Sequence, residues 1–121
     1  LKDNNHHVRE SAVRAFGQSN NILAVQFLVD ALMDDDTLVS LEAIRGLAKL
    51  GDLRAINPLI RILREDNDVL RRSAAIVLGA IGDARAIEPL KECLDGYDHD
   101  VRKAAAAPLN ILRERLSKSN Q

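Results

Sequence analysis

The feature that most constrains this chain is an internal repeat of 31 residues. When the sequence is aligned with itself at that shift, apolar residues superpose over three periods, with no insertion between residues 1 and 109. The columns are Val8, Val39, Leu70 and Val101; Ala12, Ala43, Ala74 and Ala105; Phe16, Leu47, Leu78 and Leu109; and Leu28, Leu59 and Leu90. A unit of this size cannot bury its own apolar face, so successive units must stack against one another.

Each period contains the patterns of two helices. In the third period, residues 69–81 carry apolar side chains at the spacing of one helix face. Asn67 precedes this helix as an N-cap, and Gly82 follows it, where a left-handed residue favours glycine. A shorter helix is predicted over residues 85–94, with Pro89 in its first turn. No strand pattern competes with these helices. The sequence therefore predicts an all-α fold, a right-handed α-solenoid of stacked two-helix repeats.

The composition agrees with closely packed helices and argues against several classes of protein. Hydrophobic residues make up 46 % of the chain and aromatic residues only 2 %, so the core must consist of Ala, Leu, Ile and Val. No apolar run reaches the ~18–20 residues that a membrane-spanning helix needs. The formal net charge of −1 argues against a general binder of nucleic acid or anionic membranes. Because no secretion-signal pattern opens the chain, we expect a cytoplasmic protein.

Three segments carry a resemblance to a known family. Residues 8–17 (VRESAVRAFG) and 70–79 (LRRSAAIVLG) resemble the V-R-x-x-A-A-x-A-L-G helix of HEAT-like repeats, and residues 82–90 (GDARAIEPL) are similar to the stretch that follows it. The resemblance is to the subtype named after the phycobilisome bilin lyases. It implies that the V-R helices line a concave face, where partners of such solenoids usually dock.

The repeat phase predicts one HEAT-like domain over residues 1–121. Its periods are expected at about 5–35, 36–66 and 67–97, followed by a C-terminal capping helix at about 98–116 and a frayed tail at 117–121. Pro108 should kink the capping helix, because it removes an intrahelical hydrogen bond. Residues 1–3 match the end of a V-R helix, so we expect further repeats upstream in the parent protein. The uncapped first repeat leaves apolar surface through which a second copy could associate.

One departure from the repeat concerns a predicted ladder of arginines. Arg9, Arg71 and Arg102 share a column that Ser40 interrupts. We expect these arginines to bind turn carboxylates such as Asp52 and Asp83, with a gap in the ladder at Ser40.

The residues that most often carry chemistry favour structural roles here. His6 and His7 are adjacent at a helix start and are predicted to point in different directions, and His99 lies three repeats away, too far to share a metal ion with them. The acidic run at residues 34–36 lies at a turn and lacks the glycine and distal glutamate of a calcium loop. Cys93 occupies an apolar column and is predicted to be a small core residue. We therefore predict no catalytic residue, no metal site and no cofactor.

What remains is a surface, and the best prediction is a non-catalytic scaffold that binds another protein or peptide. The positions expected on the concave face combine apolar and basic side chains, as protein-binding patches do. The candidate binding residues are Glu10, Arg14, Leu38, Leu41, Arg45, Val69, Arg72, Ile76 and Lys103. A competing interpretation is that Leu41 or Ile76 is simply packed between helices.

Two alternatives for the function stay open at this stage. The resemblance also fits a fragment of a bilin lyase or isomerase, or of a phycobilisome-associated factor. The chain is equally compatible with an accessory repeat module of a larger enzyme. No nucleic acid or membrane is predicted as a partner.

Overall fold

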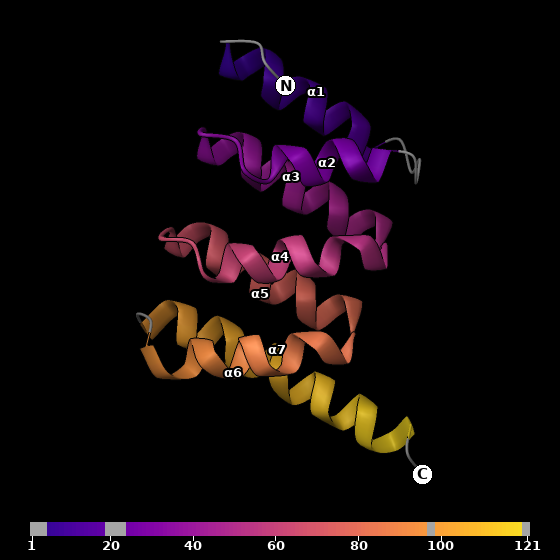
Figure 1. The fold of residues 1–121 in the computed structure, drawn as a ribbon, viewed down its shortest axis with the longest axis vertical. Coiled ribbons are helices and arrows are strands. Elements are labelled where there is room, and N and C mark those ends of the chain that lie inside the picture. Colours follow the sequence, from indigo (N-terminus) through magenta and orange to yellow (C-terminus); the bar gives the residue numbers. More distant parts are fainter. Residues whose placement is uncertain (1–4, 19–23, 97–98, 120–121) are drawn as a thin grey trace. The chain divides into compact units, whose positions relative to one another are not determined.

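The computed structural model describes residues 5–18, 24–96 and 99–119, with the side chains of residues 16–18 and 96 left aside. Within these ranges the chain forms α-helices and short 3₁₀ helices and contains no strand (Figure 1). The elements are α1 (His6–Gln18), α2 (Val25–Ala31), α3 (Thr37–Leu50), η2 (Leu53–Ala55), α4 (Ile56–Leu63), α5 (Asp68–Ile81), η3 (Ala84–Ala86), α6 (Ile87–Gly96) and α7 (His99–Ser119). None of these helices is both long and apolar enough to cross a membrane.

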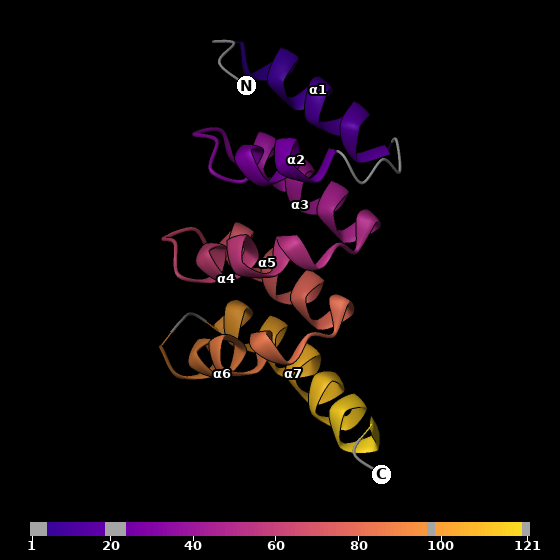
Figure 2. The same cartoon turned by 45° about the vertical axis from the view of Figure 1, so that its right-hand side comes forward.

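The chain divides into two compact units, Leu1–Pro58 and Leu59–Gln121, and the division falls within α4. In the first unit α3 packs against both α1 and α2. In the second unit α7 packs against both α5 and α6 (Figures 1 and 2). Each unit therefore contains helices from successive repeats in contact, which confirms the predicted all-α fold class of stacked two-helix repeats.

The predicted caps begin and end the helices. The Asn67 side chain accepts a hydrogen bond from the Leu70 N–H, and Asp36 accepts one from the Leu38 N–H. Gly51 and Gly82 end α3 and α5 with φ of 62° and 81°, the left-handed conformation expected of them. The Asp98 cap that the repeat predicts lies outside the described residues.

The repeat columns form the core. Buried members of these columns, each at most 7 % exposed, are Val39, Leu70, Val101, Ala43, Ala74, Ala105, Leu47, Leu78, Leu109, Leu28, Leu59 and Leu90. Val8 is the exception, with 49 % of its surface exposed. No described helix precedes α1 to cover it, whereas α2 and α6 pack against the helices that carry Val39 and Val101.

The arginine ladder has different partners from those predicted. Asp52 and Asp83 cap the 3₁₀ helices, and they bind Arg54 and Arg85 two residues along the chain. These hydrogen bonds lower the pKa of both carboxyls. The prediction that they belong to the ladder was wrong, because a carboxylate at an N-cap lies beside the arginine that follows it in the same turn.

The true ladder partners lie in the loops that precede the V-R helices. Arg71 donates from Nε to the Glu65 carbonyl (2.5 Å) and from Nη1 to Asp68 (2.7 Å). At the interrupted position, the Ser40 hydroxyl donates to the Asp34 carbonyl (3.2 Å), which is the carbonyl equivalent to that of Glu65 one repeat earlier. The Ser40 gap is therefore bridged at the backbone by a shorter side chain.

The last helix runs three residues beyond its predicted end. Helix α7 continues to Ser119 with Pro108 inside it, and Lys118 lies in its final turn. No glycine stops it where Gly82 stops α5, and a cation near a helix C-terminus is favourable.

Candidate functional site

The candidate residues of the first unit form an ion-pair network between two helices. Arg14 of α1 lies 2.6 Å from Glu10 on the same helix and 3.5 Å from Glu42 of α3. Arg45 lies 2.6 Å from the other oxygen of Glu42. The predicted basic stripe is thus matched here by two glutamates, so this surface is polar without a net positive charge.

The apolar candidates of the first unit differ in exposure. Leu38, at the start of α3, is 52 % exposed, whereas Leu41 is half-buried. The competing interpretation, that Leu41 packs between helices, is therefore partly right.

The candidate residues of the second unit lie on α5 and α7. Val69 and Ile76 are exposed at 41 % and 57 %. Arg72 is half-buried and its Nε lies 3.4 Å from the Asp68 carbonyl. Lys103 is exposed at the start of α7, and Lys103 and Ile76 border the same pocket.

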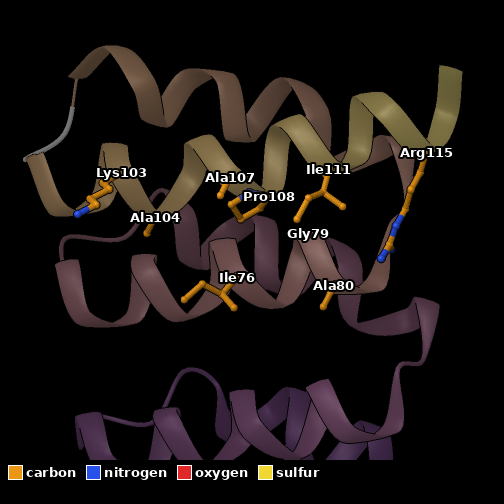
Figure 3. Close-up of a pocket in the computed structure, with 9 residues that line it drawn as sticks. All are labelled: Ile76, Gly79, Ala80, Lys103, Ala104, Ala107, Pro108, Ile111 and Arg115. Carbon is orange, nitrogen blue, oxygen red and sulfur yellow. The ribbon is translucent and has the colours of Figure 1, made fainter.

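That pocket lies between α5 and α7 and has a volume of about 480 Å³ (Figure 3). Its lining residues are Ile76, Gly79, Ala80, Lys103, Ala104, Ala107, Pro108, Ile111 and Arg115. Lys103 and Arg115 lie at its opposite ends, and the side chains between them are apolar (Figure 3). The arrangement can hold an apolar group with an anion at either end.

A close approach of two helices forms the floor of this pocket. A Cβ added to Gly79 of α5 would lie 2.8 Å from the Pro108 Cα of α7, so only glycine fits there. At the C-terminal end of α5, Arg115 Nη1 lies 3.2 Å from the position that a Cβ on Gly82 would take. Arg115 thus extends over the turn that ends α5.

The sequence predictions missed Ile111, Pro108 and Arg115 as surface residues. The signal was present, because residues 104, 107, 108, 111 and 115 fall at the i, i+3, i+4, i+7 and i+11 spacing of one helix face. Pro108 was interpreted only as a kink, which drew attention away from the face that it shares with Ile111.

The histidines pack differently from the prediction. The rings of His6 and His7 have centroids 4.0 Å apart and are tilted by 41°, so the expectation that they point apart was wrong. Nδ1 of His6 also lies 3.9 Å from Asp36. Within the described part of the chain, no group of three or more His, Cys, Asp or Glu side chains is placed to hold a metal ion.

Cys93 is buried in α6, as predicted, and should be nearly inert. Burial, with the nearby Glu92 charge, raises the pKa of its thiol to about 11 from a reference value of 9.0. Because the thiolate is the reactive form, its population at pH 8 is about a hundredfold below that of an unperturbed thiol. We expect Ellman's reagent to label the native protein at least about a hundredfold more slowly than the same protein in denaturant. Equal rates in the two states would contradict the burial of Cys93.

Comparison with known proteins agrees with the repeat architecture. A family model described as HEAT repeats matches residues 25–110, which is well over half of the chain. No curated protein matches the sequence.

Proposed function

We propose, from the premise that this chain belongs to the HEAT repeat family, that it is a non-catalytic scaffold for a protein or peptide partner. HEAT repeats generally mediate protein–protein interaction. The proposed binding residues are those on the V-R helices, α1 and α3 in the first unit and α5 and α7 in the second. We propose that these helices form the concave face.

The observation that carries the proposal is the set of exposed apolar side chains on these helices. Leu38, Val69 and Ile76 are all more than 40 % exposed, in a chain whose other repeat positions bury their apolar residues thoroughly. Basic side chains accompany them, with Arg45 on α3 and Lys103 beside Ile76. Apolar centres with arginine or lysine around them are typical of protein-binding surfaces.

The lining of the pocket supports a binding role over a catalytic one. Its lining residues provide no carboxylate, histidine, cysteine or hydroxyl, which are the usual sources of general acids, bases and nucleophiles. We propose that the pocket binds without transforming its ligand.

The proposal predicts that charge reversal on the V-R helices weakens binding without unfolding the protein. Photocrosslinking with p-benzoylphenylalanine in place of Leu38 or Val69 should capture one partner, identified by mass spectrometry. Adding Arg45→Glu and Arg72→Glu should then reduce capture at least about tenfold, with helicity and melting temperature unchanged, because both side chains lie at the proposed interface.

Two matched controls separate this surface from the rest of the molecule. Leu53 is as exposed as Ile76, at 57 %, but lies on η2, so a crosslinker there should capture nothing. Arg61→Glu makes the same charge change at an exposed position on α4 and should leave capture unchanged. Equal crosslinking from Leu53 and Leu38, or full capture by the doubly reversed variant, would contradict the proposal.

The bilin lyase subtype supports a second, narrower proposal. Its motif occurs at residues 82–90, and the pocket offers cationic residues that suit the propionates of a linear tetrapyrrole. Mixing the protein with biliverdin tests it: a shifted visible absorbance band that titrates to saturation supports tetrapyrrole binding, and an unchanged spectrum rejects it.

A further inference from the structure

We propose that the pocket between α5 and α7 binds an acidic amphipathic helix, with its apolar side chain in the pocket and carboxylates on Lys103 and Arg115. This inference rests on the proposed interaction function and names the chemistry of the partner.

The shape and lining of the pocket suit an apolar side chain. Its volume of about 480 Å³ lies within the ~300–1,000 Å³ of sites that enclose a ligand. Small residues form much of its lining, since Gly79 allows α5 and α7 to approach closely. Ile76 and Ile111, 57 % and 45 % exposed, provide apolar surface that a ligand would cover. Burial of these two side chains is the main gain available on binding.

The charges around the pocket select an anionic partner. Its lining includes two cations and no carboxylate, whereas the arginines on α1 and α3 are matched by glutamates. Helix α7 carries five Lys or Arg and two Asp or Glu residues, a net charge of +3. The Arg115 guanidinium has five N–H donors in a fork that fits a carboxylate. Complementary charge of this kind speeds association and fixes orientation.

The spacing of the two cations defines the ligand. Lys103 and Arg115 are twelve residues apart on one helix, or ~18 Å at 1.5 Å per residue. Two glutamates eleven residues apart on a partner helix lie on the same face at ~16.5 Å, within reach of both flexible cations. Apolar residues midway between them would then lie over Ile76 and Ile111. Recognition of this kind is the helix-in-groove mode.

A nucleic acid suits this pocket less well than an acidic helix. Sequence-tolerant binding of single strands relies on aromatic side chains that stack on bases, and no lining residue is aromatic. Phosphates would also leave the apolar residues between the two cations without a partner.

The test uses the whole chain and a synthetic fluorescent peptide that carries two glutamates three helical turns apart, with leucines between them on the same face. A control peptide has lysine at both glutamate positions. Fluorescence anisotropy should show saturable binding of the acidic peptide only, weakening as salt is raised. Lys103→Glu should weaken binding at least about tenfold. The Lys103→Glu variant should bind best a peptide with lysine at the facing end, which is a rescue that a merely structural defect would not produce.

Matched variants address fold and surface. Arg113→Glu makes a similar charge change on α7, at an exposed position that does not line the pocket, and should change affinity less than about twofold. Ile76→Asp should abolish binding, whereas Leu53→Asp, at a side chain with the same 57 % exposure, should not.

The possible failures are distinguishable. If the acidic peptide does not bind, or if a single-stranded oligonucleotide competes for the Ile76 site as well as the peptide does, the inference is overturned. Crosslinking of a partner from Leu38 or Val69 would still stand in that case, so the proposed function would survive and only the acidic-helix ligand would be lost. If crosslinking from those positions also fails, the interaction function itself falls.

Discussion

Gly79→Ala is expected to lower the free energy of unfolding by about 3 kcal/mol, although alanine is the better helix former. The new Cβ would lie 2.8 Å from the Pro108 Cα, and a backbone atom cannot rotate away as a side chain does. Relief therefore requires α5 and α7 to move apart, which loosens the contacts on which the second unit depends. Thermal unfolding followed by circular dichroism should show a melting temperature roughly 10 °C lower.

The neighbouring residue provides the control for this substitution. Ala80 is exposed on the same helix, and Ala80→Gln adds more volume there without entering the helix contact. Its melting temperature should stay within ~2 °C of that of the original chain. A Gly79→Ala protein as stable as the original, or stabilised by the better helix propensity, would show that α5 and α7 do not meet at Gly79.

The repeat pattern predicted the helices because each helix depends on residues close in sequence. A column such as Ala43, Ala74 and Ala105 records one buried position three times, so an accidental match at one site does not mislead. The caps Asn67 and Gly82 act within one helical turn, where hydrogen bonds are fixed by local geometry. These features needed no knowledge of tertiary contacts.

The partners of the long polar side chains could not be predicted in the same way. An arginine at a given repeat position can reach several loop carboxylates, and the choice depends on the distance between helices. Arg71 binds the loop before its own helix, whereas Arg9 binds Asp34, 25 residues further along the chain. The pocket was half-predicted for a similar reason: Ile76 and Lys103 follow from the repeat, but Arg115 lies beyond its last period.

Replacing Arg9 with methionine is expected to cost about 3 kcal/mol, because it would leave a buried carboxylate without its cation. Arg9 donates from Nε (2.9 Å) and Nη2 (3.3 Å) to the two oxygens of Asp34. The two side chains are only 13 % and 7 % exposed, so water cannot readily replace the guanidinium. The pair also joins α1 to the loop before α3, where Ser40 contributes a single hydrogen bond in place of an arginine.

A double-mutant cycle measured by chemical denaturation separates the ion pair from simple loss of packing. Asp34→Asn combined with Arg9→Met removes both charges, and it should recover more than half of the stability lost in Arg9→Met alone. Arg14→Met provides the comparison on the same helix: its side chain is 47 % exposed, and loss of its pairs with Glu10 and Glu42 should cost less than about 1 kcal/mol. Equal losses for Arg9→Met and Arg14→Met would mean that the Asp34 carboxylate is hydrated in solution. Burial of the pair, rather than the number of its hydrogen bonds, is what makes Arg9 the costlier arginine to lose.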